Sequence, residues 1–120
     1  MPKTLVADNG SRYEIRRILA RPGKSADLIV AYRRRGQGPT TFSAYRYEPD
    51  GAWKCLNGAW TDLEQAEKDV PHVQGYAPLV SPQLLRFLSA AIGVAEPVPV
   101  GEGPELPEHV EAEYRKEKST

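Results

Sequence analysis

The residues best suited to covalent or acid–base chemistry are few in this sequence and stand far apart. Cys55 is the single cysteine, and the two histidines are His72 and His109. A thiolate–imidazole pair of Cys55 and His72 would make a nucleophilic site, but neither residue stands in a segment typical of an oxyanion-stabilising turn. We therefore expect no catalytic residue, and a small enzyme that uses Cys55 or His72 is the remotest hypothesis for the function.

The sequence offers neither a phosphate-binding loop nor a set of cysteines for a disulfide or a metal site. Gly23-Lys24-Ser25 matches the end of a phosphate-binding loop, but Ile18 stands where that loop has its first glycine. A strand is also expected after Ser25, where the motif needs a helix, so these residues are assigned to a hairpin turn. The single cysteine excludes an intrachain disulfide and a cysteine-only metal site. No metal and no cofactor are predicted.

The chain carries its charge in two halves of opposite sign, although its net charge is zero. Residues 1–60 contain eleven Lys and Arg against five Asp and Glu, and residues 61–120 reverse these numbers. Arginine and tyrosine interleave in the basic half, and antiparallel pairing of its strands would bring several of them onto one face. The candidate partner-binding residues are Arg16, Arg17, Arg21, Lys24, Tyr32, Arg33, Arg34, Arg35, Tyr45, Arg46 and Tyr47.

Two kinds of partner fit such a face, and the sequence leaves both open. The first hypothesis is a small non-catalytic binding protein that acts through protein–protein contacts, as an accessory or inhibitor protein of phage or plasmid type does. The alternative is a nucleic-acid-binding module, in which guanidinium groups meet phosphates and tyrosine rings stack on bases. An ordinary sheet face would show the same composition, because tyrosines pack across strands and arginines on an edge strand hinder its pairing with other chains.

The elements that must position these residues begin with a series of strands. Alternating apolar residues predict a strand at 12–19, with a bulge or an end where the pattern shifts at Arg16-Arg17. The segment 27–34 is apolar on both faces, which indicates a central strand. A hairpin over 40–56 turns at Asp50-Gly51, where glycine supplies a positive φ.

The period of the pattern changes after residue 60. A helix is predicted at 61–70, where Thr61 and Glu64 match a capping box. A second helix is predicted at 81–93, with Ser81 as its N-cap, a proline at its first position and its end at Gly93.

The predicted fold class is α+β, with a small antiparallel sheet of three to five strands over residues 4–60 followed by the two short helices. Residues 1–94 are expected to form one domain. The segment 95–120 is rich in Pro, Gly and Glu and is expected to be a flexible acidic tail, with a marginal helix at 107–118.

The remaining expectations concern location and assembly. No apolar run approaches the ~18 residues of a membrane span, and the N-terminal residues do not resemble a signal peptide. We therefore expect a cytoplasmic protein with no membrane partner. Its partner is a protein or a nucleic acid, and exposed edge strands would also permit a dimer.

Overall fold

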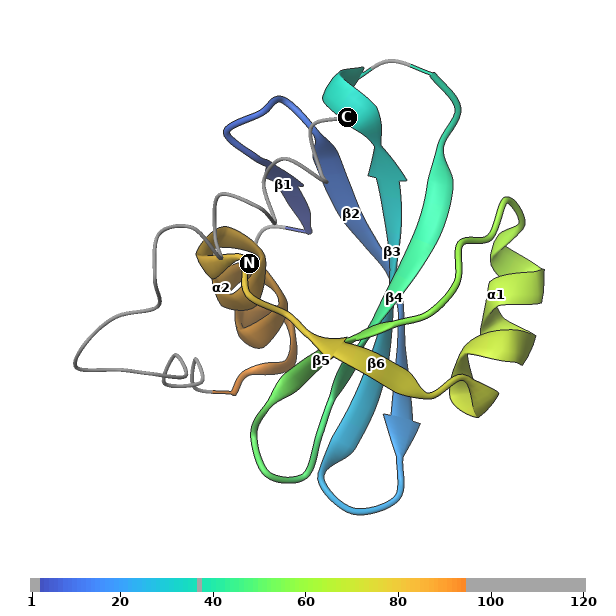
Figure 1. Ribbon diagram of the computed structural model, residues 1–120, viewed down its shortest axis with the longest axis vertical. Coiled ribbons are helices and arrows are strands. Elements are labelled where there is room, and N and C mark those ends of the chain that lie inside the picture. The colour runs from blue at the N-terminus through green and yellow to red at the C-terminus, as the bar shows by residue number, and fades with distance from the viewer. Residues whose placement is uncertain (1–2, 37, 95–120) are drawn as a thin grey trace. The chain divides into compact units, whose positions relative to one another are not determined.

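The computed structural model describes residues 3–36 and 38–94, which form two compact units divided after Leu79 (Figure 1). The first unit contains a six-stranded antiparallel sheet whose strands lie side by side in chain order. Its strands are β1 (Thr4–Val6), β2 (Arg12–Arg21), β3 (Ser25–Arg33), β4 (Thr41–Tyr47), β5 (Trp53–Leu56) and β6 (Gly75–Pro78). Its helical segments are the 3-10 turns η1 (Arg34–Gly36) and η2 (Val70–His72) and the helix α1 (Leu63–Asp69), while α2 (Pro82–Ile92) belongs to the second unit.

The hairpin of β2 and β3 contains the predicted bulge. Its register shifts between Ile15 and Arg17, so Arg16 is the additional residue. Before the shift, Tyr13 stands opposite Tyr32. After the shift, Arg17 stands opposite Ile29, whose side chain points to the other face of the sheet. A bulge of this kind turns the side chains of both residues at the insertion toward one face of the sheet. Arg16 and Arg17 therefore share a face.

The sheet buries apolar residues on both of its faces. On the first, called the helical face, Ile29, Ala44 and Leu56 pack with Ala66 of α1 and Val70 of η2. The opposite face, called the tyrosine face, carries a second buried set on alternate positions. Its members are Tyr13, Leu28, Val30, Tyr45 and Trp53. Both faces of β3 are buried, as the apolar run over 27–34 predicted.

The N-cap of the first helix lies one residue later than predicted. The N-cap of α1 is Asp62, in an extended conformation and without a side-chain capping bond, so the capping box of Thr61 and Glu64 is wrong. Burial of Ala66 and Val70 in the core fixes the helix instead. The helix ends at Asp69 and continues as the 3-10 turn η2.

A sixth strand lies beyond the predicted limit of the sheet. β6 pairs with β5, with Cys55 opposite Ala77 and Lys54 opposite Pro78, so the sheet has six strands rather than three to five and extends past residue 60. A short segment that contains Gly and Pro is a poor strand by composition. It is tolerated here because β6 is an edge strand, where a missing N–H donor costs little.

The second unit contains the helix predicted at 81–93. The Ser81 hydroxyl accepts a hydrogen bond from the Leu84 N–H at 3.4 Å, and Gly93 ends the helix in the left-handed conformation with φ 69°. The predicted caps are therefore confirmed. The expected tail at 95–120, with its helix at 107–118, lies outside the described residues.

Candidate partner-binding surface

Two of the predicted partner-binding arginines belong to a buried ion cluster. The register of β3 and β4 sets Asp27 opposite Arg46, and both are buried, with exposed fractions of 0% and 7%. The Asp27 carboxylate accepts from Arg46 Nε at 2.7 Å and from Arg46 Nη2 and Arg21 Nη1, each at 3.2 Å. The arginines also donate to the carbonyls of Val70 at 3.2 Å and Pro71 at 2.9 Å. Their role in this structure is to fasten η2 to the sheet.

A third arginine of the predicted set is held against α1. Arg17 Nε donates to Glu67 Oε1, and Arg17 Nη1 donates to the backbone carbonyl of Arg16 at 2.8 Å. Both side chains of the ion pair are more than a third exposed, at 46% and 37%. Solvent screening makes such a pair worth less than about 1 kcal/mol. The contact orients Arg17 more than it stabilises the fold.

The three predicted tyrosines lie on the tyrosine face, away from the arginines. Tyr32 packs on Tyr13 with their ring centroids 5.2 Å apart, and Tyr47 packs on Trp53 at the same separation. Tyr45 is buried between them in the sheet. Alternation along β3 and β4 separates each tyrosine from the arginine beside it. Tyr45 and Tyr47 are therefore not brought together with the arginines, and Tyr32 meets them only where it contributes to the lining of the hollow described below.

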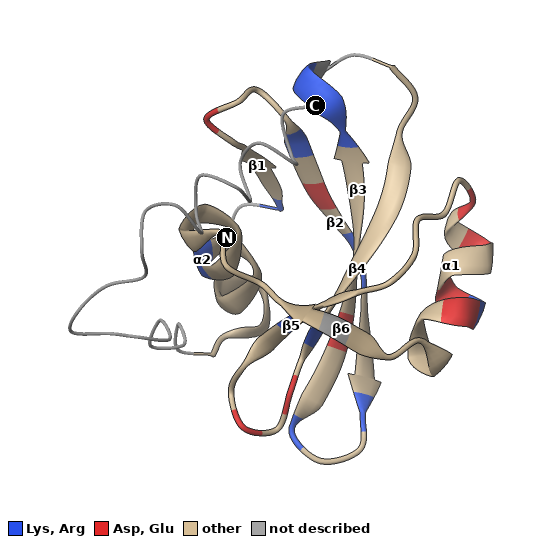
Figure 2. Cartoon of the chain, viewed as in Figure 1, with Lys and Arg blue, Asp and Glu red and all other residues tan. Residues whose placement is uncertain are grey.

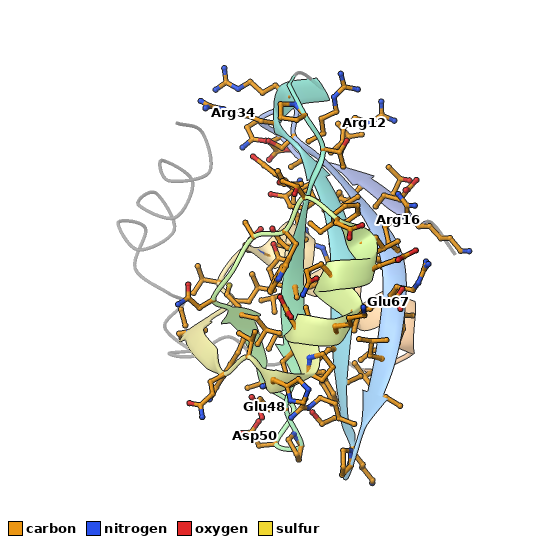
Figure 3. All side chains as sticks on the ribbon, turned by 90° about the vertical axis from the view of Figure 1, so that its right-hand side faces the viewer. Arg12, Arg16, Arg34, Glu48, Asp50 and Glu67 are labelled. Carbon is orange, nitrogen blue, oxygen red and sulfur yellow. The ribbon has the colours of Figure 1, made fainter. Side chains whose placement is uncertain are left out.

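The remaining arginines gather where β2 begins and β3 ends (Figure 2). Antiparallel pairing sets Arg12, the first residue of β2, directly opposite Arg33, the last residue of β3. The turn η1 follows at once and adds two more arginines. We call this exposed set the arginine end; its members are Arg12, Arg16, Arg33, Arg34 and Arg35. In Figure 3, Arg12 and Arg34 lie above α1, and Glu48 and Asp50 lie at the opposite end of the sheet.

A shallow hollow of about 200 Å³ opens within the arginine end. Its lining residues are three arginines and one glutamate, together with Thr4, Ala31, Tyr32 and Thr40. Glu14 Oε1 lies 3.5 Å from Arg16 Nη1. The Cζ atom of Arg16 also lies over the Phe42 ring, 6.0 Å from its centroid. One carboxylate against three guanidinium groups leaves the hollow cationic, so it favours an anionic group.

The backbone of the arginine end is strained at one residue. Arg35 has φ 47° and ψ 28°, and it is the one residue other than glycine with a positive φ in the described chain. This conformation costs an ordinary L-residue about 1–2 kcal/mol. Gly10 is its neighbour: a β-carbon added at Gly10 would lie 3.7 Å from the Cα of Arg35. The turn thus holds an arginine where glycine would be less strained.

Lys24, the last residue of the predicted set, is remote from this surface. It lies in the turn between β2 and β3, beyond the far end of β2. A strand of this length places it roughly 30 Å from Arg12. A second hollow of about 430 Å³ opens near that end, but the arginines that line it, Arg21 and Arg46, are those bonded to Asp27.

The structure does not bring together the two residues of the enzymatic hypothesis. Cys55 stands opposite Tyr45 and therefore points to the tyrosine face, where it is half-buried. His72 belongs to η2 and lines the second hollow beside Arg46 and Lys54 on the helical face. The sheet separates the thiol from the imidazole.

Five residues of the arginine end and its hollow were not among the predicted set: Thr4, Arg12, Glu14, Ala31 and Thr40. The signal for Arg12 was available, because antiparallel pairing across the turn at 22–24 places it opposite Arg33 once the bulge at Arg16 is counted. The threonines carry no such signal. They reach the hollow only through the pairing of β1 with β2 and the loop that precedes β4.

Comparison with protein-family models, with curated proteins and with solved structures gave no match for this chain. Within residues 3–36 and 38–94, no group of three or more His, Cys, Asp or Glu is placed to hold a metal ion. No helix of that part is long and apolar enough to cross a membrane.

Proposed function

We propose that this chain is a non-catalytic binding protein whose arginine end receives an acidic surface of a partner protein. The observation that carries the proposal is the cross-strand pair of Arg12 and Arg33. Like charges directly opposite in a sheet are unfavourable, by a few tenths of a kcal/mol or more. Within the described residues, neither side chain has a carboxylate at ion-pairing distance. An anionic partner would relieve this repulsion.

The contrast with the other arginines supports the same proposal. Arg21 and Arg46 satisfy a buried carboxylate and two backbone carbonyls, so the fold itself requires them. Arg12, Arg33 and Arg35 are exposed and satisfy no buried carboxylate, although Arg33 Nε donates to the Gly38 carbonyl at 3.1 Å. Arg35 also retains a strained backbone, and strain of this kind is often found at functional sites.

A protein is favoured over a nucleic acid as the partner. Tyr45 and Tyr47 lie on the face opposite the arginines, and the ring of Tyr32, a residue that lines the hollow, packs on Tyr13. The surface therefore lacks a row of stacking platforms like those with which single-stranded nucleic acids are bound. An apolar side chain stands beside the guanidinium groups instead, because Val6 pairs with Arg12 and is 58% exposed. Arginine next to exposed apolar surface is typical of protein interfaces.

The test is an affinity capture from the native host with quantitative mass spectrometry, run with and without nuclease. The test variant combines Arg12→Gln, Arg33→Gln and Arg35→Gln. A matched control combines Lys24→Gln, Lys68→Gln and Arg86→Gln, which removes as many positive charges from exposed positions elsewhere. Far-UV circular dichroism and thermal unfolding verify that both variants fold as the wild type does.

The proposal expects one protein to be retained by the wild type and by the control, lost from the test variant and insensitive to nuclease. Reconstitution with that purified protein should then give an affinity that falls as salt rises, because exposed charges are screened. Equal retention by the test variant would refute the role of the arginine end. Loss of all bound material on nuclease treatment would instead support the nucleic-acid alternative.

A further inference from the structure

The hollow of the arginine end holds more positive charge than its own residues neutralise. Arg12, Arg16 and Arg33 line it, and Glu14 is the one acidic residue among its lining residues, so these four carry a net charge of +2. Glu14 Oε1 lies 3.5 Å from Arg16 Nη1, and both side chains are more than a third exposed. Within residues 3–36 and 38–94, neither Arg12 nor Arg33 has a carboxylate at ion-pairing distance. Two guanidinium groups are therefore left without a counter-charge.

These two arginines are placed so that one ligand can contact both. Arg12 stands directly opposite Arg33 across β2 and β3, and side chains at such positions leave the same face about 4.5–5.5 Å apart at their β-carbons. Arg33 Nε donates to the Gly38 carbonyl at 3.1 Å, which uses one N–H donor of the guanidinium group. The bond orients Arg33 and leaves its terminal amino groups for a ligand.

The charge of the hollow favours a phosphomonoester over a carboxylate. A phosphorylated side chain carries a charge of about −1.5 to −2 at neutral pH and three acceptor oxygens, so a single group can neutralise both Arg12 and Arg33. A single carboxylate would leave one of them unbalanced. Two carboxylates would have to stand close together, where they repel each other. The phosphodiester of a nucleic acid has only one negative charge.

The remaining lining residues favour a short side chain as the carrier of the phosphoryl group. Ala31 is the one aliphatic residue among them, and the ring of Tyr32 packs on Tyr13. The hollow thus offers little apolar surface to the ring of a phosphotyrosine. Thr4 and Thr40 are hydroxyl-bearing residues, and a hydroxyl group can donate to a phosphoryl oxygen.

We propose that the hollow binds a phosphoryl group carried by a serine or threonine side chain of the partner protein, with Arg12 and Arg33 as its principal contacts. This inference rests on the proposed function and specifies which acidic group of the partner the arginine end receives. Guanidinium groups bind phosphoryl oxygens through charge-assisted hydrogen bonds, which are stronger than neutral ones. Arg16 provides a third cation, which Glu14 shares with the ligand.

The test is a titration of the isotope-labelled full-length chain, followed by NMR at the backbone amides and the arginine Nε–H groups. The probe is the acetylated and amidated peptide Gly-Ser-Gly-Xaa-Gly-Ser-Gly with phosphoserine as Xaa. Comparison peptides carry serine, phosphotyrosine or two successive glutamates in its place, and a short oligothymidine represents nucleic acid. Inorganic phosphate is added as a competitor.

The phosphoserine peptide should bind about fivefold or more tightly than each comparison ligand, with the largest shifts at Arg12 and Arg33, and inorganic phosphate should displace it. Arg12→Gln should weaken binding by about tenfold, because it removes a donor to a charged group. Lys24→Gln removes the same charge from an exposed turn outside the hollow and should leave the affinity unchanged. Glu14→Gln should tighten binding by about twofold, since it removes a competing carboxylate.

Each contrary result overturns a stated part of the inference. Equal affinity for the glutamate peptide would overturn the choice of a phosphoryl group, and equal affinity for the phosphotyrosine peptide would overturn the choice of carrier. Tighter binding of oligothymidine would overturn the choice of a protein ligand. Equal effects of Arg12→Gln and Lys24→Gln would show that the hollow is not the site.

The outcomes also separate this inference from the proposed function. If the partner identified by affinity capture is lost from the test variant but is still retained after phosphatase treatment, the phosphoryl group is wrong and the proposed function stands. If the phosphoserine peptide binds in the hollow while the test variant still retains the partner, the proposed function is wrong in its site.

Discussion

The buried cluster around Asp27 offers the sharpest quantitative test of the fold that carries these surfaces. Asp27→Asn removes a charge that three N–H groups address, while it keeps the size of the side chain. Arg46 is 7% exposed and would remain as a buried cation without its counter-charge. Removal of one partner from a buried pair costs about 3–5 kcal/mol. We expect a loss near the middle of that range, because Arg21 is more exposed than Arg46 and can reach solvent.

The loss is measured by urea unfolding at neutral pH, followed by far-UV circular dichroism. A small domain has about 5–15 kcal/mol of stability, so the midpoint should fall by a quarter or more. Arg17→Gln, which breaks the exposed pair with Glu67, is the matched control and should cost less than about 1 kcal/mol. If Asp27→Asn and Arg17→Gln cost the same, the cluster does not hold η2 to the sheet and the reasoning fails.

Two further predictions concern single residues. Burial, and then the neighbouring Tyr32 and Cys55, raise the pKa of Tyr13 above its ordinary value. As the pH rises, this phenol therefore ionises in the unfolded chain before it does so in the folded protein, and stability that is present below about pH 10 should be lost above it. Tyr13→Phe should reduce this loss in urea midpoints measured between about pH 9 and pH 11.5. An unchanged dependence of the midpoint on pH would contradict the prediction. Arg35→Gly should relieve the left-handed strain and raise the free energy of unfolding by about 0.5 kcal/mol, after the added flexibility of glycine in the unfolded chain is deducted, while it weakens partner retention. A lower urea midpoint for that variant would show that Arg35 is not strained.

Local patterns in the sequence predicted the central part of the sheet because each depends on neighbouring residues. The two-sided apolar run at 27–34, the phase shift at Arg16-Arg17 and the glycine turn at Asp50-Gly51 all appear where the pattern puts them. The caps of α2 do so as well. One local pattern misled, because the N-cap of α1 is Asp62 and not the predicted Thr61. The missed strand involves pairing at a distance. β6 exists because β5 offers it a partner, and no periodicity within 75–78 indicates a strand.

The candidate surface could be predicted only in part, for the same reason. Composition identified a basic segment, but it does not predict which of its arginines form ion pairs with carboxylates in the fold. Arg46 and Arg21 bond Asp27 because the register of β2, β3 and β4 places them beside it. Arg17 pairs with Glu67, which lies on a helix fifty residues away in the sequence. Tyrosines next to arginines in the sequence lie on the opposite face because a strand alternates.

One strand, β2, connects the arginine end to the part of the sheet that α1 and η2 cover. Its bulge sends Arg16 toward the hollow of the arginine end and Arg17 toward α1 on the same face. Without the inserted residue, the alternation that begins at Arg12 would place Arg17, Leu19 and Arg21 on the tyrosine face, away from Glu67 and Asp27. The bulge therefore lets a single strand carry Arg12 and Arg16 at the arginine end and, on the same face, Arg17 and Arg21, which bond α1 and η2 to the sheet.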